Sequence, residues 1–328
     1  MPEIVLLVAI IGAALLYDFY NGLNDCANSI ATTVTTRALR PWQAVALAAL
    51  FDFVGAFTST KVAATIGKGV IDPEQITLLV VLCGVLGAAL WTAICSHYGI
   101  PISVTHALVG GLVGAGMVAL GTEAINFKVV GRVLLAMIVS PIAGFLGGLI
   151  LLVALLWIFR RLSPFQANRL FRGGQIASAS FMALSHGMND AQNAMGVITM
   201  ALVSYGALKE FAVPFWVIAS CAAAMSLGTS IGGWKVVRTM GQKVTALKPP
   251  QGFAAETSAA TVITVMSQLG MPISTTHVIA TAIMGTGVAQ RLSDVRWLIV
   301  IRIVTTWVVT IPGAAAFGAS LYFLLSLI

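Results

Sequence analysis

The chain has 328 residues, of which 59% are hydrophobic and only 9% are charged, and its formal net charge is +7. Soluble domains carry about 25% charged residues, so this composition excludes a water-soluble fold and predicts an all-α polytopic membrane protein. The basic residues lie in short loops, as membrane topology requires, and no nucleic-acid partner is expected. The four cysteines are scattered without metal-ligand spacing and predict small buried side chains.

Ten apolar segments follow one another along the chain, and a spanning helix needs about 20 such residues. In the first half they lie at 4–36, 41–65, 76–97, 101–120 and 129–159. In the second half they lie at 175–205, 211–234, 253–269, 272–290 and 297–327. Basic residues with Pro and Gly separate the halves. We therefore expect membrane repeat 1 at 1–159, a basic cytoplasmic linker at 160–174 and membrane repeat 2 at 175–328.

Two polar motifs occur twice within this apolar chain. Residues 96–111 read SHYGIPISVTHALVGG, and residues 267–282 read SQLGMPISTTHVIATA. Upstream of each copy stands an Asn-Asp motif, GLNDCAN at 22–28 and GMNDAQN at 187–193. The repetition predicts a duplicated membrane protein whose functional site lies at the duplicated motifs.

The loop charges predict how the two repeats are oriented. With both termini outside the cell, the inside loops hold twelve basic residues: Arg37, Arg40, Arg160, Arg161, Arg169, Arg172, Lys235, Arg238, Lys243, Lys248, Arg291 and Arg296. The outside loops hold five: Lys61, Lys68, Lys128, Arg132 and Lys209. This bias follows the positive-inside rule. Five crossings per repeat invert the second repeat, in a multi-pass protein of the cell membrane with extracytoplasmic termini.

The Asn-Asp motifs supply carboxylates within apolar segments. Such a charge costs a few kcal/mol unless it is paired or hydrated, so it marks a functional site. Asp25 and Asp190 are joined on one helical face by Asn28 and Asn193. An oxygen-rich group of this kind suits Na⁺ or H⁺, and the alternative is packing of helices through polar hydrogen bonds.

Three further acids lie within apolar segments and lack an acidic counterpart in the other repeat. Asp52 and Glu256 are additional candidates for the cation site, because single buried acids are expected to face a polar interior. Asp18 ranks below them, since it fits a membrane interface equally well.

The Pro-Ile-Ser-x-Thr-His motifs predict broken or re-entrant helices. Pro begins a helix, Ser caps its first turn, and the free N–H groups at that end attract an anion. The expected anion-binding side chains are those of Ser103, Thr105, Ser274, Thr275 and Thr276, with the amides of Asn24 and Asn189. The alternative is a Pro kink satisfied by neighbouring hydroxyls.

The histidines are weaker candidates for the functional site than the carboxylates and hydroxyls. His106 and His277 belong to the duplicated motif, where a packing role is favoured over proton transfer. His186 has no counterpart in the first repeat, where Asn21 stands, and we give it little importance.

Both motif pairs, in this order, make the chain from Tyr17 to Gly287 resemble the inorganic phosphate transporter (PiT) family. The resemblance implies inverted repeats and phosphate uptake driven by Na⁺ or H⁺. It also matches important carboxylates to Asp25, Asp190, Asp52 and Glu256, and the motif serines to Ser103 and Ser274.

We therefore expect a phosphate symporter, with Na⁺ favoured over H⁺ as the coupling ion, and alternating access to a site near the bilayer midplane. The expected partners are inorganic phosphate and the lipid bilayer, with no cofactor besides the coupling ion. A homo-oligomer is left open. A sulfate permease of the same fold is the nearest alternative, because hydroxyls and helix dipoles do not separate two tetrahedral oxyanions. An anion channel and an intramembrane hydrolase are remoter, and no enzyme motif is present.

Overall fold

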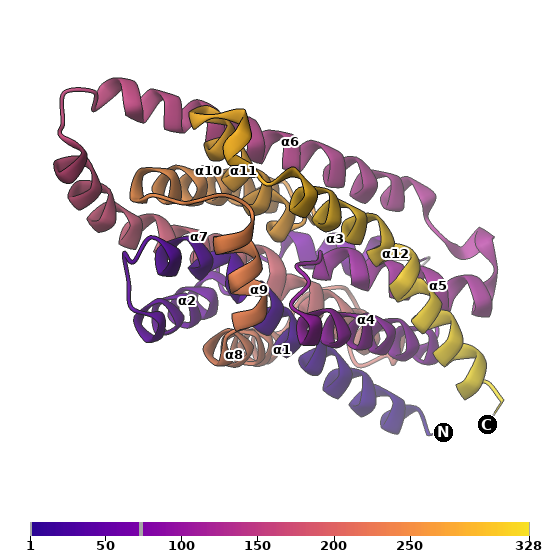
Figure 1. Cartoon of the computed structure of the whole chain (residues 1–328). Helices are drawn as coiled ribbons and strands as arrows, with labels where there is room; N and C mark the ends of the chain where they lie inside the picture. The colour runs from indigo at the N-terminus through magenta and orange to yellow at the C-terminus, as the bar shows by residue number, and fades with distance from the viewer. Residues whose placement is uncertain (1, 72–74, 328) are drawn as a thin grey trace.

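A computed structural model describes residues 2–71 and 75–327, and α-helices dominate the described part (Figure 1). The helices of the first half are α1 (Glu3–Thr35), α2 (Pro41–Gly55), α3 (Lys61–Gly69), α4 (Leu78–Tyr98), α5 (Val104–Leu120) and α6 (Phe127–Ile158). Those of the second half are α7 (Pro164–Ser204), α8 (Phe215–Ile231), α9 (Trp234–Arg238), α10 (Pro249–Gln268), α11 (Thr275–Gln290) and α12 (Trp297–Leu325). Four of these, α1, α4, α6 and α12, are long and apolar enough to cross a membrane. The bent pair of α8 with the segment 234–243 gives a fifth. The expected class, an all-α polytopic membrane protein, is thus confirmed.

Two expected segments are each divided. The segment at 41–65 forms α2 and α3, and the segment at 211–234 forms α8 followed by α9. The axis bends by 61° between α8 and the segment that starts at α9. Gly232 adopts φ +77° at this bend, a left-handed conformation that favours glycine. Average hydropathy does not register such breaks, because the few residues that form them change the mean of a long apolar segment little.

Most of the expected linker is helical. Ser163 and Gln166 form a capping box, in which the Ser163 hydroxyl accepts from the Gln166 N–H and the Gln166 side chain accepts from the Ser163 N–H. Residues 164–174 are therefore the first three turns of α7, which continues unbroken to Ser204.

The two halves make corresponding contacts. Helix α1 packs on α4 and α8, and its counterpart α7 packs on α10 and α2. In the same way, α5 packs on α12, and its counterpart α11 packs on α6. A glycine before each Asn-Asp pair permits one of these approaches. A Cβ at Gly22 would lie 2.0 Å from the Met225 carbonyl oxygen, and one at Gly187 would lie 2.1 Å from that of Asp52. The Asn-Asp motifs are thus held against α8 and α2.

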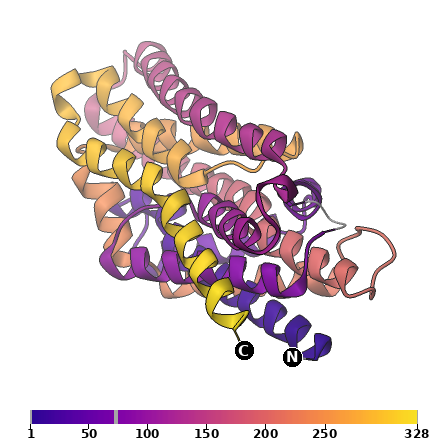
Figure 2. The ribbon, with the colours of Figure 1, turned by 90° about the vertical axis from the view of Figure 1, so that its right-hand side faces the viewer.

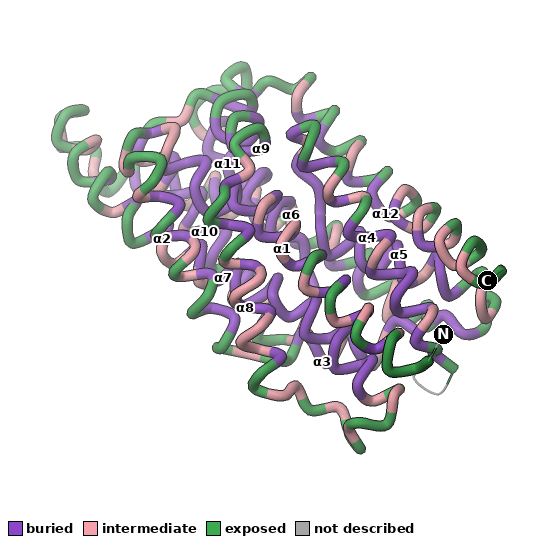
Figure 3. The backbone as a smooth tube through the Cα atoms, turned by 90° about the horizontal axis from the view of Figure 1, so that it is seen from below, coloured by how far each residue is buried: buried purple, intermediate pink, exposed green. Residues whose placement is uncertain are grey.

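The centre of the molecule is formed by the middle turns of α1 and α7, which are almost entirely buried (Figure 3). Helix α6 lies at the periphery against α10 and α11, and α12 lies against α4 and α5 (Figure 1). The chain termini lie near each other at one end (Figure 2). The pairs α4–α5 and α10–α11 are hairpins whose turns pass through Gly99 and Gly270 at φ +71° and +69°. Each duplicated Pro-Ile-Ser element therefore leads from a turn into a helix start.

Candidate functional site

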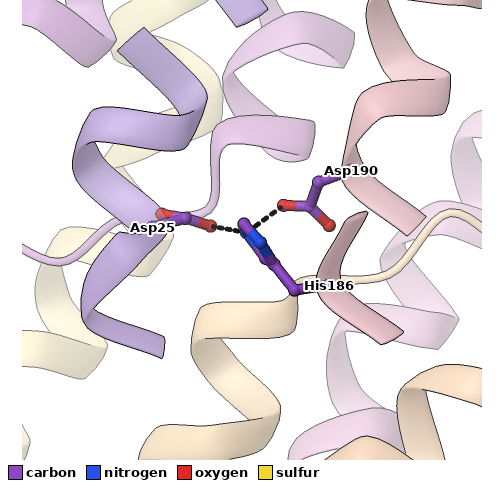
Figure 4. Close-up of side chains that lie close together, drawn as sticks. All are labelled: Asp25, His186 and Asp190. Carbon is purple, nitrogen blue, oxygen red and sulfur yellow. Dashed lines mark ion pairs between the residues drawn. The ribbon is translucent and has the colours of Figure 1, made fainter. Parts of the chain in front are cut away.

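Three residues from the two Asn-Asp regions meet at the centre of the protein. The His186 Nε2 atom lies 3.9 Å from Asp25 Oδ2 and 3.5 Å from Asp190 Oδ2, as Figure 4 shows. One ligand atom from each residue lies within 4.8 Å of the others, and all three side chains are buried. Because His186 and Asp190 are one turn apart on α7, they project from the same face of that helix toward α1. A single cation can therefore contact both carboxylates.

A third carboxylate holds the other side of the imidazole. The His186 Nδ1 atom lies 2.9 Å from Asp52 Oδ1. A carboxylate accepts hydrogen bonds, so Nδ1 carries the proton and Nε2 is the atom turned toward the other two acids. The Thr229 hydroxyl donates to Asp52 Oδ2 at 2.7 Å. Asp52 thus fixes the orientation of His186 from α2.

The second Pro-Ile-Ser motif contributes two hydroxyls to the same place. The Thr275 hydroxyl lies 3.3 Å from Asp25 Oδ2 and 3.1 Å from Asp190 Oδ2, and the Thr276 hydroxyl donates to Asp25 Oδ2 at 3.0 Å. The amide of Asn28 donates to both threonine oxygens at 3.2 and 3.0 Å. The start of α11 is therefore bonded directly to both Asn-Asp motifs.

The first Pro-Ile-Ser motif has the corresponding contact. The Asn193 amide donates to the Thr105 hydroxyl at 2.9 Å. Ser103 and Ser274 cap the two helices in the same way, because each hydroxyl accepts the N–H three residues later at 3.2 Å. The rings of the two motif histidines lie 5.2 Å apart, so the starts of α5 and α11 approach each other.

The amides of Asn24 and Asn189 are oriented alike. Asn24 Nδ2 donates to the Ser96 hydroxyl at 2.9 Å, and Asn189 Nδ2 donates to that of Ser267 at 2.8 Å. Each serine donates its own proton to a carbonyl one turn earlier in its helix, so it can only accept from the amide. The amide oxygens of both asparagines consequently point away from the serines.

Several buried oxygen atoms in this region have no hydrogen-bond partner within the described part of the chain. All are acceptors: Asp18 Oδ1 and Oδ2, Asn21 Oδ1, Asn24 Oδ1, Asp25 Oδ1, Asn189 Oδ1, Asp190 Oδ1 and Asn193 Oδ1. A buried polar atom without a partner costs about 1–3 kcal/mol, and more when it is charged. Oxygen acceptors without donors are suitable ligands for a cation, and buried water can also donate to them.

Glu256 lies in a separate polar cluster. Its carboxylate accepts from the hydroxyls of Thr32 and Ser178 and from the Gln175 amide, the last at 3.3 Å. Gln175 in turn accepts from the Thr36 hydroxyl at 2.6 Å. Thr32 is seven residues beyond Asp25 on α1, a rise of about 10 Å, so this cluster stands apart from the central one.

The structure brings most of the expected residues together. Asp25 and Asp190 contact the second-motif threonines, and Asp52 contacts His186 beside them. Asn28 contacts the second-motif threonines, and Asn193 contacts the first-motif threonine. Glu256 stands apart. His186, which received little importance from its sequence position, is the residue that links the three acids. Its spacing of four residues from Asp190 was the available signal.

Comparison with known proteins shows the family of the chain. The phosphate transporter family matches residues 21–318. A probable low-affinity inorganic phosphate transporter of Rhizobium meliloti is 47% identical over 98% of this chain and 97% of its own length. One from Bacillus subtilis is 43% identical over 99% of this chain and 98% of its own. A solved structure described as the sodium-dependent phosphate transporter superposes with a TM-score of 0.90, at 28% identity, over 99% of this chain and all of that one. The chain belongs to the phosphate transporter family.

Proposed function

We propose that the protein is a Na⁺-coupled symporter of inorganic phosphate. Membership of a transporter family makes it a transporter rather than an enzyme. The coupling ion rests on the buried acceptors, and the similarity to a sodium-dependent phosphate transporter supports it.

The cation half of the site consists of Asp25 and Asp190 with the free amide oxygens of Asn24 and Asn189. Na⁺ prefers such hard oxygen ligands. From the sequence we expected the two asparagines to bind phosphate, but their hydrogen bonds to Ser96 and Ser267 favour the cation. Asp52 acts through His186 rather than as a direct ligand.

The anion half is formed where α5 and α11 begin. Their caps leave the first N–H groups of each helix without a helical partner, at the positive end of the dipole. The hydroxyls of Thr105, Thr275 and Thr276 add donors without adding charge. Both starts adjoin the acidic cluster, so phosphate and cations would share one site near the bilayer midplane.

Electrostatics explains why transport is coupled. At an effective dielectric constant of about 20, two unit charges about 4 Å apart interact by about 4 kcal/mol. Phosphate beside Asp25 and Asp190 is repelled by each carboxylate to about this extent until cations neutralise them. Phosphate binding therefore requires Na⁺, and Na⁺ binding is strengthened by phosphate to the same degree.

Alternating access follows from the repeated architecture in this proposal. The corresponding contacts of α1 with α8 and α7 with α2 fit two related halves, and the loop charges favour their inversion, with both termini outside. Rocking of one half against the other would open the site to each side in turn.

Uptake of labelled phosphate into proteoliposomes, with Na⁺ and pH gradients imposed separately, tests the proposal. We expect accumulation against a phosphate gradient with Na⁺ alone, and its loss in Asp25→Asn and Asp190→Asn. Asp294→Asn, at an exposed acid, is the matched control and keeps transport. Uptake driven by the pH gradient alone would overturn Na⁺ coupling, and flux without accumulation would indicate a channel. Competition by sulfate would indicate the sulfate permease.

A further inference from the structure

Two cavities lie at corresponding places in the two halves, outside the central site. The larger, of about 460 Å³, is lined by the turn at 99–101, by Thr239 and Lys243, and by Arg302 on α12. The smaller, of about 120 Å³, is lined by the turn at 269–272, by Thr65, and by Arg132 on α6. Each turn leads into a Pro-Ile-Ser element. Arg132 and Arg302 correspond as well, since each is five residues after the first residue of its helix.

The inner wall of each cavity is held by a short helix from the other half of the chain. On α9, Lys235 Nζ donates to the His97 carbonyl at 2.6 Å, and Thr239, just beyond α9, donates to that of Gly99 at 3.1 Å. On α3, the equivalent bonds run from Lys61 to the Gln268 carbonyl at 3.0 Å and from Thr65 to that of Gly270 at 2.7 Å. The four bonds fix both turns, and with them the starts of α5 and α11.

The larger cavity presents positive charge and hydroxyls without a compensating acid. Among the ion pairs of the described residues, none involves Arg302 or Lys243. Thr239, Thr305 and Thr306 line the same cavity, but each of their hydroxyls donates its proton to a backbone carbonyl. The cationic side chains of arginine and lysine are therefore the groups that can bind a phosphate group here.

The floor of this cavity touches the central site. Ile100 lines the cavity, and its carbonyl oxygen accepts from the Asn24 amide at 3.4 Å. Ser103, the cap of α5, follows two residues after Pro101. The turn at 99–101 therefore contacts both the cavity and the central site.

We propose that these cavities are the two mouths of the transport pathway, and that Arg302 with Lys243 binds inorganic phosphate at the larger mouth. Arg132 takes the corresponding place at the smaller one. This inference rests on the proposed function and adds a second, peripheral phosphate site to it. Under the proposed topology the Lys243 mouth faces the cytoplasm.

Protection of an introduced thiol tests the site directly. Thr305 lines the larger mouth and is exposed, whereas the four native cysteines are buried. Thr305→Cys is labelled with a water-soluble thiol reagent on purified protein in lipid-free detergent, in an Asp25→Asn background. Inorganic phosphate at about ten times its dissociation constant leaves about a tenth of the sites free, so labelling slows about tenfold. Arg302→Gln is expected to remove this protection. Arg132→Gln, at the other mouth, and Arg169→Gln, at an exposed position on α7, keep it.

Labelling that phosphate does not slow, or that it slows equally with Arg302→Gln, overturns the peripheral site. Protection by added phosphatidylglycerol but not by inorganic phosphate also overturns it and identifies a lipid headgroup as the occupant. Because Asp25→Asn already removes Na⁺-driven accumulation in the proposed function, these outcomes are independent of Na⁺ coupling. A failure of coupling in proteoliposomes would likewise leave the protection unchanged.

Discussion

Replacing Thr275 by valine isolates the bond between the anion half and the cation half of the site. Valine keeps the shape of the side chain and removes the hydroxyl, which lies 3.3 Å from Asp25 Oδ2 and 3.1 Å from Asp190 Oδ2. A hydroxyl has one proton and donates to one carboxylate at a time. The variant therefore loses one hydrogen bond to a charged acceptor, about 1.5–3 kcal/mol, which is about 10- to 150-fold in an equilibrium constant. It also loses the bond accepted from the Asn28 amide, which keeps the Thr276 hydroxyl as a partner.

The assay is the initial rate of labelled phosphate uptake as a function of Na⁺ concentration. Thr275→Val is expected to raise the Na⁺ concentration for half-maximal uptake and to lower kcat/KM for phosphate within that range, while Thr275→Ser keeps most of the activity. Thr281→Val is the matched control, because its hydroxyl donates to carbonyl oxygens of its own helix at 2.9 and 3.0 Å. The linking role of Thr275 is refuted if Thr275→Val transports like the native protein or if Thr281→Val is equally impaired.

Three further changes test other parts of the structure. Gly114→Ala places a Cβ 2.1 Å from a carbonyl oxygen of α12 and is expected to destabilise the protein by about 1–3 kcal/mol. Gly131→Ala, where the Cβ meets open space, is expected to stabilise it by up to about 1 kcal/mol. Equal melting temperatures of the two variants in detergent would contradict this. His186→Asn or Asp52→Asn alone removes one partner of a buried pair and costs about 3–5 kcal/mol, while the double variant costs less than the sum. Additive losses in thermal unfolding would show that the two residues are not coupled. Glu256→Gln keeps the shape of the side chain and removes its charge, so we expect phosphate uptake with a lower Hill coefficient for Na⁺; an unchanged coefficient argues against a cation at Glu256.

The central cluster was predictable wherever a residue is duplicated. The Asn-Asp and Pro-Ile-Ser-x-Thr-His motifs indicate Asp25, Asp190, Thr275 and Thr276 from the sequence alone, because two copies of a polar motif in an apolar chain stand out. The contact between them spans as many as 251 positions, and no local pattern encodes which residues meet. The divided segments at 41–65 and 211–234 were not predictable for a different reason, since a break of a few residues changes the average hydropathy of a long apolar segment little.

His186 was not predictable in this way because it is not duplicated. Its partner Asp52 lies 134 positions away, and Asn21 stands at the equivalent place in the first repeat. A search for repeated motifs therefore does not find His186. The available hint was Asp52, because a buried acid in an apolar helix requires a partner. Asp18 is the remaining case, a buried acid whose two oxygens have no partner within the described structure.

In the proposed mechanism, the unduplicated polar groups let a repeated fold favour one of its two end states over the other. The Glu256 cluster uses Thr32, Gln175 and Ser178, and the corresponding positions of the other half are apolar: Val85, Val197, Ile10 and Ala13. Two halves with identical side chains would exchange roles when the protein rocks, and its two end states would have equal energy. A charge present on one side alone has different surroundings in each state and shifts the equilibrium between them. In this proposal the duplicated residues build the site that both states share, while Asp52, His186 and Glu256 are expected to distinguish the states. A cation bound at Glu256 would therefore act on the balance between inward and outward states more than on phosphate affinity.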